Sequence, residues 1–462
     1  MSLPPRPEGL PGSFRDCDGF VFRSNGLYYR QVNCSYRETY DELVKTGLYE
    51  RLWRQKLLIS HQEINQPQEA DGYRTLFPEQ LPVIVYPFEW SFGQLKDAAL
   101  LTLAIEQESL AAGFSLKDAS AYNVQYLRGR PIFIDTLSFE RYREGEPWRA
   151  YRQFCQHFLA PLALMARVDP RLGLLLRNHI DGIPLDLASR LLGWGSRFRL
   201  GLLLHVHLHA RVQRRFQNKQ RRVQNRPISK QGRLGILTHL ESTIRGMEWR
   251  PKGTEWADYY ANTNYADPAR ADKRAAVDGW IEELQPRQVW DLGANDGTFS
   301  RLASRRGIPT VAWDIDPAAV EIGYRRAKKE KDRSLFPAVL DLTNPSPALG
   351  WNLTERCSLF DRPKPDLVLA LALIHHLAIG NNVPLERCAA FFARVAPSVI
   401  IEWVPKEDSK VQELLLNRED IFTGYTRDKF ESAFSRYYKR MRVRECSGSH
   451  RLLYCFDEHP EQ

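Results

Sequence analysis

The stretch Val289–Ala303, VWDLGANDGTFSRLA, constrains the fold of this chain more than any other. A short apolar run contains Asp291, a small polar turn lies between Gly293 and Gly297, and a helical pattern then runs to a stop at Gly307. A strand, a tight turn and a helix start in that order place free helical N–H groups beside the carboxyl end of a strand. Glycine at both turn positions lets the backbone bend sharply and approach a ligand. The stretch therefore predicts an α/β sheet with a polar ligand at its edge.

The turn does not suit a dinucleotide, because the G-x-G-x-x-G fingerprint is not met. Asn295 occupies the place of the middle glycine and Thr298 that of the last, so a pyrophosphate would lose its close backbone approach. Asp291, just ahead of the first glycine, favours a ligand amino group over a phosphate.

Two more carboxylates follow at the ends of the next two strand-like runs. Asp314 ends the run PTVAWD, about 20 residues after the first acid, where a ribose diol is usually held. Asp341 ends the run LFPAVLD and can accept a hydrogen bond from an exocyclic adenine amine. Two alternatives stay open: Asp316 can replace Asp314 as the ribose acid, and Asp341 can be a helix cap.

Strand and helix patterns alternate from a composition shift near residues 250–254 to the end of the chain, as a parallel sheet requires. Residues 366–377 and 398–405 are predicted as the fourth and fifth strands, and residues 440–456 as a closing hairpin. We therefore expect one domain over residues 251–462.

An amino group, a ribose and an adenine without a phosphate describe S-adenosyl-L-methionine, and residues 255–462 resemble the class I S-adenosylmethionine-dependent methyltransferases. DLGANDG resembles the family's Asp/Glu-x-Gly-x-x-x-Gly signature, DIDP and LDL resemble its second and third acidic tips, and ALIHHL resembles its fourth-strand end. Asn295 departs from the commoner middle glycine. The resemblance implies a Rossmann-like, mostly parallel sheet with an antiparallel last strand. The cofactor-binding residues that it implies are Asp291, Gly293, Asn295, Gly297, Asp314, Ile315, Asp341 and Leu342.

Methyl transfer needs a base only if the acceptor must lose a proton. The candidates at the fourth and fifth strand ends are His375, His376 and Glu402, while Trp403 could stack on the acceptor or on the cofactor cation. The two histidines are adjacent, so we expect them to point different ways, and one of them can simply fill the core.

The acceptor class is suggested only by analogy with the family. The fourth strand ends in LALIHHL and lacks the Asn-Pro-Pro-Tyr type of loop, which disfavours a nucleobase amine and makes nucleic acid an unexpected partner. A small-molecule, glycan or natural-product acceptor is therefore expected. In the aromatic segment ahead of the sheet, Tyr259, Tyr260 and Tyr265 are expected to line the site.

Charge and cysteine usage add weaker constraints. The net charge is +9, and the basic run at residues 211–226 is either a solvated helix face or a surface for a phosphate or acidic partner. Seven scattered cysteines without a C-x-x-C pair argue against a disulfide framework and a zinc site. Residues 1–15 are expected to be a flexible tail, and residues 200–212 are too short and too rich in His and Arg to cross a bilayer. We expect a cytoplasmic protein without a membrane span.

The first half of the chain, residues 16–250, is predicted as an α+β domain whose second part is helical. A hairpin is expected around Asn25-Gly26, strands over residues 81–88 and 131–139, and a helix over residues 93–113.

Three polar residues of this half, Asp118, Asn123 and a strand-end Asp135, have a spacing that resembles the catalytic and metal-binding loops of protein-kinase-like folds. The resemblance implies that the first orients an acceptor hydroxyl and that the other two hold magnesium under ATP phosphates. Thr136-Leu137 replaces the usual Phe-Gly, and we find no glycine-rich phosphate loop. The alternative is that all three are turn and cap residues.

The whole arrangement also resembles bacterial nodulation-type methyltransferases with a long N-terminal region, which implies a specialised glycan or secondary-metabolite acceptor. Three functions stay open: a methyltransferase, a bifunctional protein that also binds ATP, and a non-catalytic module that binds S-adenosylmethionine.

Overall fold

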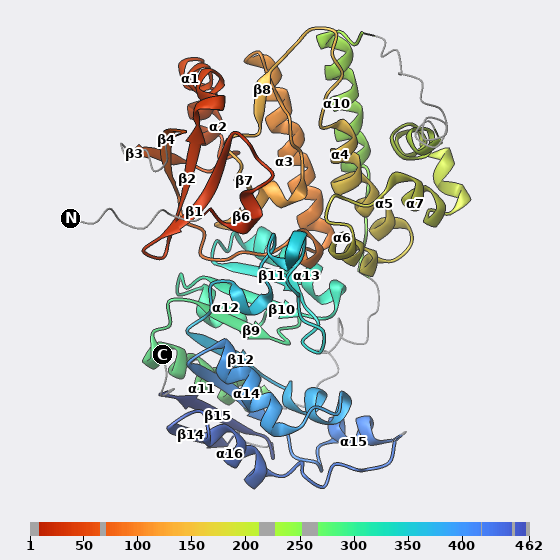
Figure 1. The fold of residues 1–462 in the computed structure, drawn as a ribbon. Coiled ribbons are helices and arrows are strands. Elements are labelled where there is room, and N and C mark those ends of the chain that lie inside the picture. The colour runs from red at the N-terminus through yellow and green to blue at the C-terminus, as the bar shows by residue number, and fades with distance from the viewer. Residues whose placement is uncertain are drawn as a thin grey trace, which may run out of the picture. The chain divides into compact units, whose positions relative to one another are not determined.

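The computed structural model describes residues 9–64, 71–211, 227–251, 267–416, 418–445 and 449–458. The chain forms two compact units (Figure 1). The N-terminal unit comprises residues 1–250 together with residues 348–357, and the C-terminal unit comprises residues 251–347 and 358–462.

The C-terminal unit is built on a seven-stranded sheet with the order β11-β10-β9-β12-β13-β15-β14. All pairs among the first five of these strands are parallel, and β15 alone runs against its neighbours. The strands are β9 (Val289–Leu292), β10 (Thr310–Asp314), β11 (Leu335–Val339), β12 (Leu367–Ala370), β13 (Ser398–Trp403), β14 (Arg440–Glu445) and β15 (Leu452–Asp457).

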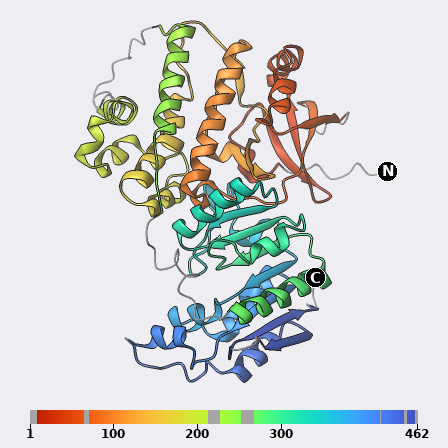
Figure 2. The ribbon, with the colours of Figure 1, turned by 180° about the vertical axis from the view of Figure 1, so that it is seen from behind.

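Helices cover both faces of this sheet, so its central strands are buried throughout, as parallel strands usually are. Seen from behind, α11 lies across one face (Figure 2) and joins α12 in an apolar cluster with Val289, Leu369 and Ile400. The helices of this unit are α11 (Asp267–Leu284), α12 (Ser300–Ser304), α13 (Pro317–Glu330), α14 (Leu385–Val395), α15 (Ser409–Leu415) and α16 (Arg427–Ser435).

The strand order confirms the predicted Rossmann-like fold of the class I methyltransferases. The chain moves outward from β9 to β11 and then returns to the other side of β9, which leaves a topological switch point between β9 and β12. One expectation was wrong: the fourth strand ends at Ala370 rather than continuing to Leu377. Ala372 adopts a positive φ of 52°, which a strand does not allow, and a helical turn follows it.

The N-terminal unit begins with an antiparallel sheet of order β1-β2-β4-β3. The predicted hairpin is confirmed, because β1 and β2 meet across Asn25 and Gly26, whose φ angles are 50° and 81°. The sheet strands are β1 (Gly19–Ser24), β2 (Leu27–Asn33), β3 (His61–Ile64) and β4 (Gly72–Pro78), and α1 (Arg37–Lys45) and α2 (Leu48–Arg54) lie between β2 and β3 in the chain.

A long helix and two short strand pairs follow this sheet, and short helices complete the unit. This order of elements agrees with the kinase-like layout: a small antiparallel sheet is followed by a helix, by short strand pairs and by a helical region. The elements are α3 (Phe92–Ala111), β5 (Phe114–Leu116) paired with β8 (Phe139–Arg141), β6 (Val124–Leu127) paired with β7 (Arg130–Phe133), α4 (Tyr151–Phe154), α5 (Ala160–Arg167), α6 (Leu175–Asn178), α7 (Leu185–Leu191), α8 (Leu200–Leu202) and α10 (Lys230–Arg245).

Three details of this unit differ from the sequence-based expectations. Residues 81–88 form no strand, since the backbone of Val85 bonds the side-chain amide of Gln125 instead of a neighbouring strand. The strand expected over residues 131–139 is split into β7 and β8 by a turn. Residues 9–15 carry a 3₁₀ helix, and Leu10 N donates to Val21 O, so these residues are not a free tail.

Residues 348–357 leave the C-terminal part of the sequence and belong to the N-terminal unit. Glu355 pairs with Arg15 at 2.8 Å, the guanidinium of Arg356 lies 4.4 Å from the ring centroid of Tyr122, and Cys357 N donates to Tyr86 Oη. Within the described ranges, no helix combines the length and the apolarity that crossing a bilayer requires.

Candidate functional site

The glycine turn after β9 has the geometry that its sequence predicts. Gly293 and Gly297 have φ angles of 75° and 77°, and Asn295 between them also has a positive φ of 53°. A Cβ atom on Gly293 would lie 3.1 Å from the Leu373 side chain, so any residue other than glycine would be crowded at this position. The turn is anchored to β10, because Gly293 N and Ala294 N both donate to Trp313 O at 2.9 Å.

Asp314 at the tip of β10 is bound to this turn. Its Oδ2 accepts from Asn295 N at 2.7 Å and its Oδ1 from Asp316 N at 2.9 Å. Each carboxylate oxygen has a second lone pair, so the group can still accept from a diol. Asp316 instead caps α13 through Oδ1, and its Oδ2 is buried without a hydrogen-bond partner among the described residues.

Asp291 lies beneath the turn and is almost fully buried. Its Oδ2 accepts from Ser300 Oγ at 2.6 Å. Burial raises the pKa of Asp291 to about 7, and the nearby Asp314 adds to this effect. Burial also raises the pKa of Asp314 to about 6. The edge of the sheet thus holds two carboxyl groups that a positively charged or hydrogen-bonding ligand would help to ionise.

The remaining predicted cofactor residues lie at the same edge of the sheet. Ile315, next to Asp314, is 58% exposed, which is unusual for a large aliphatic side chain beside a buried strand. Asp341 follows β11 and accepts from Thr343 N at 2.8 Å and from Thr343 Oγ1 at 2.6 Å. Asp341 therefore forms a turn, and no helix begins there among the described residues, so the helix-cap alternative does not hold. Leu342 beside it is half-buried.

The two histidines lie in the helical turn after β12 rather than in the strand. Their ring centroids are 4.1 Å apart, so they pack together and do not point different ways. His375 is fully buried, and neither ring nitrogen has a hydrogen-bond partner among the described residues. Burial, His376 and two nearby cations, Arg451 and Lys273, hold the pKa of His375 well below its usual range. Burial and Arg451 lower the pKa of His376 to about 4. Both rings are therefore neutral near pH 7.

Glu402 is fully buried in β13 and forms an ion pair with Lys273 of α11, with Nζ 2.6 Å from Oε2. Arg451 lies 3.9 Å from the other oxygen and makes a two-pronged pair with Asp408 at 2.7 and 2.9 Å. Sequence reasoning missed Lys273 and Arg451, because both come from segments distant from the motifs.

Trp403 stacks on Tyr425 at a centroid distance of 4.4 Å and is 3% exposed, so the expectation that it faces a ligand was wrong.

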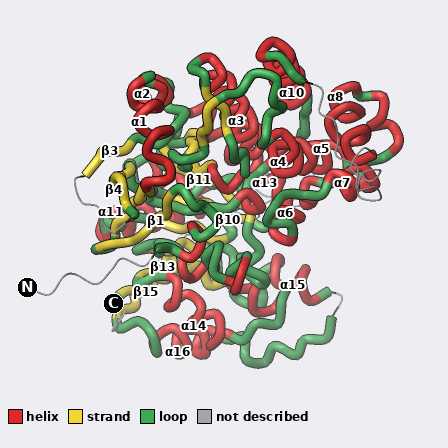
Figure 3. The backbone as a smooth tube through the Cα atoms, turned by 45° about the horizontal axis from the view of Figure 1, so that its top comes forward, coloured by secondary structure: helices red, strands yellow, loops and turns green. Residues whose placement is uncertain are grey.

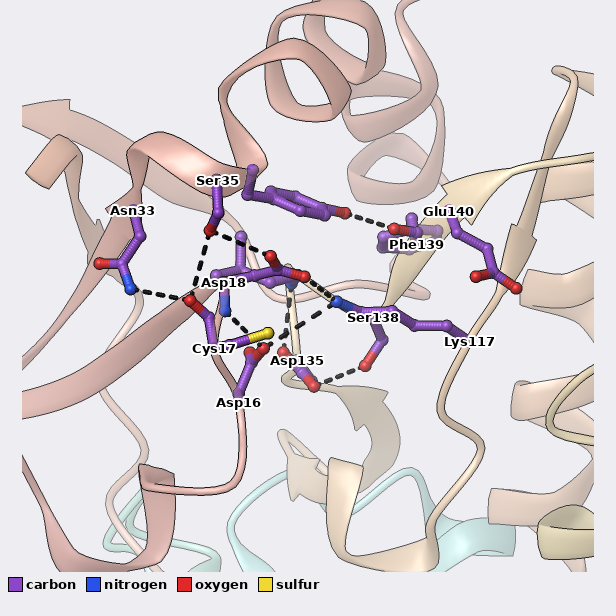
Figure 4. Close-up of polar contacts among 12 residues, drawn as sticks. Asp16, Cys17, Asp18, Asn33, Ser35, Lys117, Asp135, Ser138, Phe139 and Glu140 are labelled. Atoms are coloured by element: carbon purple, nitrogen blue, oxygen red, sulfur yellow. Dashed lines mark hydrogen bonds and ion pairs between the residues drawn. The ribbon is translucent and has the colours of Figure 1, made fainter. Parts of the chain in front are cut away.

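A second polar cluster lies in the N-terminal unit, where Asp118 interacts with Asn123 and Asp135. Figure 4 shows Asp135 beside Ser138 and Lys117. Burial and the nearby Asp135 raise the pKa of Asp118, whose carboxylate is hydrogen-bonded to Asn123. Asp135 Oδ1 pairs with Arg30 of β2 at 2.8 Å, and Ser138 donates to Oδ2. Turn bonds are also present, since Asp118 accepts from Ser120 N and Asp135 from Leu137 N. Both interpretations of the three residues thus find support in the geometry.

Two acidic residues that sequence reasoning missed complete this cluster. Asp16 pairs with Arg30 at 2.9 Å, and Asp18 pairs with Lys117. Together with Cys17 they place three potential metal-ligand atoms within 4.8 Å of one another, but both carboxylates already have cationic partners.

The expected site residues Tyr259, Tyr260 and Tyr265 lie outside the described residues, as do residues 212–226 of the basic run.

Comparisons with known proteins find one relative that matches almost the whole chain. The chain is 36% identical over 472 residues to the nodulation protein NoeA of Rhizobium meliloti (strain 1021), and the match covers 99% of this chain and 98% of that protein. No protein-family model matches the chain.

Two solved structures give weaker matches, each to less than half of this chain. The bifunctional kinase-methyltransferase WbdD is 17% identical, with a TM-score of 0.30 over 43% of this chain and 41% of that one. A putative O-methyltransferase from Nostoc punctiforme PCC 73102 is 15% identical, with a TM-score of 0.32 over 44% of this chain and 60% of that one. Because these TM-scores are below 0.5, the fold assignment rests on the strand order of the sheet.

Removing one partner of the buried Lys273–Glu402 pair should destabilise the protein strongly. We expect Lys273→Met or Glu402→Gln to lower the free energy of unfolding by about 3–5 kcal/mol, because each leaves an uncompensated buried charge. The double variant should lose less than the sum of the two. Urea denaturation followed by circular dichroism measures this. The control Lys410→Met, in the exposed pair with Glu413, should lose less than about 1 kcal/mol. A Glu402→Gln protein of unchanged stability would contradict a structural role for this carboxylate.

Proposed function

We propose that this chain, which belongs to the family of the nodulation protein NoeA, is an S-adenosylmethionine-dependent methyltransferase. The single observation that carries the proposal is the edge of the C-terminal sheet at its switch point. There, a glycine turn with positive φ angles and the carboxylates Asp291 and Asp314 lie at the carboxyl ends of β9 and β10. Ligands of open α/β sheets bind at such switch points.

The residues at this edge fit the cofactor. Gly293 permits the positive φ of the turn where a side chain would crowd Leu373, and the buried Asp291 would attract the amino group of the methionine part. Asp314 would accept from the ribose hydroxyls, and the exposed Ile315 side chain offers an apolar surface to the adenine. Asn295, Gly297, Asp341 and Leu342 would complete the cradle.

The cofactor supplies a methyl group on a sulfonium, which is already activated, so the protein mainly has to position the acceptor. His375 is the first candidate to contact the acceptor, because both ring nitrogens lack a partner among the described residues. Its pKa is held well below its usual range, so it would orient an acceptor hydroxyl or amine by accepting a hydrogen bond more readily than it would hold the proton. His376 is the second candidate, whereas Glu402 is already paired with Lys273.

For the acceptor, we propose a small molecule or a glycan. The fold itself hosts many acceptors, so this part rests on the residues after β12 and on the family to which the chain belongs. β12 is followed by LALIHHL and not by an Asn-Pro-Pro-Tyr type of loop, which disfavours a nucleobase amine as the acceptor.

Cofactor binding tests the proposal directly. Isothermal titration of the intact protein with S-adenosylmethionine should give measurable heat. Asp314→Ala should weaken binding at least about tenfold, because hydrogen bonds to a charged acceptor contribute about 1.5–3 kcal/mol each. Asp366→Ala is the matched control, since this residue precedes β12 at the opposite edge of the sheet and should leave affinity unchanged. No heat from the intact protein would contradict the proposal. Binding without methyl transfer to any cell extract would favour the non-catalytic alternative.

The affinity for S-adenosylmethionine should rise with pH. In the unliganded protein the pKa of Asp291 is about 7, so this carboxyl group is largely protonated at pH 6. A cationic amino group favours the carboxylate, so binding should release a proton below about pH 7 and tighten by up to about tenfold per pH unit.

The stability of the unliganded protein should change in the opposite sense. Between about pH 4 and pH 7 the folded state binds more protons than the unfolded state, so the free energy of unfolding falls as pH rises.

Titrations in two buffers of different ionisation enthalpy measure this proton release. Asp291→Asn should abolish most of the pH dependence, whereas Asp366→Ala should keep it. Affinity that does not change between about pH 5.5 and about pH 7.5 would contradict the role of Asp291.

A second candidate function is ATP binding by the N-terminal unit, which is favoured by the convergence of Asp118, Asn123 and Asp135. Magnesium-ATP should then bind the intact protein, and Asp135→Ala should abolish that binding because a magnesium ligand is lost. The control is Asp169→Ala, which removes an exposed cap of a 3₁₀ helix. Titration that shows no binding of magnesium-ATP would leave the three residues as turn and cap residues, with Asp135 held by Arg30.

A further inference from the structure

The N-terminal unit carries a surface of large apolar side chains that pack against no core. We call it the apolar ridge, and it follows α7 and includes α8, at the periphery of the unit (Figure 3). Trp194, Phe198 and Leu200 are 70%, 73% and 61% exposed. Soluble proteins rarely expose such residues side by side without a partner. The ridge consists of Leu191, Trp194, Phe198, Leu200, Leu204 and Leu208.

The exposed rings of Trp194 and Phe198 are held in place by contacts of the loop that carries them. The rings of Trp194 and Phe198 pack edge to face with centroids 4.8 Å apart. Ser196 between them is buried, and its hydroxyl contacts Gly193 O at 2.6 Å and His207 Nε2 at 2.8 Å. His207 Nδ1 is in turn 2.8 Å from Ser189 Oγ. The loop therefore projects its rings from an anchored base instead of folding them inward.

The helical segment that follows extends the same surface. Leu200, Leu204 and Leu208 recur every four residues and are all exposed, whereas His205 and Val206 between them are buried. This spacing places the leucines along one side of α8 and the π-helical turn after it (Leu203–Leu208).

The segment that carries the ridge is basic, although one of its arginines, Arg190, pairs with Asp186 at 2.8 Å. From residue 187 to residue 211 the chain contains four arginines and neither Asp nor Glu, and the next acidic residue after Asp186 is Glu241. Arg197 and Arg199 flank Phe198, are exposed, and form no ion pair with any residue that the structure describes. An apolar surface of Trp, Phe and Leu bordered by arginines is typical of segments that lie in the membrane interface.

We propose that the apolar ridge docks the protein on an anionic lipid surface, with Trp194, Phe198 and the leucines inserted at the headgroup level. Arg197 and Arg199 would face the lipid phosphates, where each basic residue strengthens attachment to an anionic leaflet. A second copy of the chain fits less well, because a two-fold contact would bring the same arginines of both copies together. The docking is peripheral and independent of the proposed methyltransferase activity.

Vesicle flotation of the intact protein tests the docking. Binding to vesicles of phosphatidylcholine with about 30% phosphatidylglycerol should exceed binding to phosphatidylcholine alone at least about tenfold. Trp194→Ala with Phe198→Ala should lower binding to the anionic vesicles at least about tenfold. Arg197→Gln with Arg199→Gln should lower it similarly and should reduce its dependence on salt. All four side chains are exposed, so the variants should fold, as circular dichroism can verify.

The matched control replaces exposed apolar residues elsewhere. Leu416 and Ile421 of the C-terminal unit are 77% and 62% exposed, and Leu416→Ala with Ile421→Ala should leave flotation unchanged. Three results would each overturn the proposal: no flotation of the intact protein with anionic vesicles, flotation that survives loss of both rings, or a dimer in light scattering that the Trp194→Ala, Phe198→Ala variant dissociates. The last result would make the ridge an interface between copies of the chain.

Discussion

The C-terminal unit buries two carboxyl groups at the carboxyl edge of its sheet. The rest of this unit depends on how it stabilises these two groups away from water. Asp291 and Asp314 are both buried, burial raises the pKa of each, and Asp314 adds to the rise at Asp291. The protein meets this by surrounding them with donors, Ser300 for the first and the backbone of Asn295 for the second. These donors stabilise the two carboxyl groups when no ligand is bound. A ligand that brings a positive charge or two hydroxyl groups would still bind to them favourably.

Buried charge is handled differently behind the neighbouring strands. Lys273 pairs with Glu402 and Arg451 pairs with Asp408, and each pairing offsets part of the cost of burying these charged groups. Their cations also suppress protonation of His375. A ring that is neutral, buried and without its own partner among the described residues is expensive to keep in a core, and such a group is better explained by chemistry than by packing.

The N-terminal unit shows how local and convergent roles can coexist in the same residues. Asp118 and Asp135 each bind a nearby backbone N–H, which is enough to explain them as turn residues. The fold nevertheless brings them together with Asn123 and adds Arg30 from a distant strand. The ion pair of Asp135 with Arg30 is a contact that the kinase-like expectation did not include.

The sequence by itself determined the type of sheet, the glycine turn and the acidic tips of the C-terminal unit, because each depends on neighbours within a few residues. A glycine with positive φ, an apolar strand and a helix start are local requirements, and they were predicted at Gly293, at the strand that ends in Asp314 and at the segment of α12. Only the tertiary structure decided which charges face one another. The pairing of Lys273 with Glu402 and the burial of Trp403 against Tyr425 depend on segments far apart in the chain. Such contacts follow from the packing of whole elements, which residue spacing does not encode.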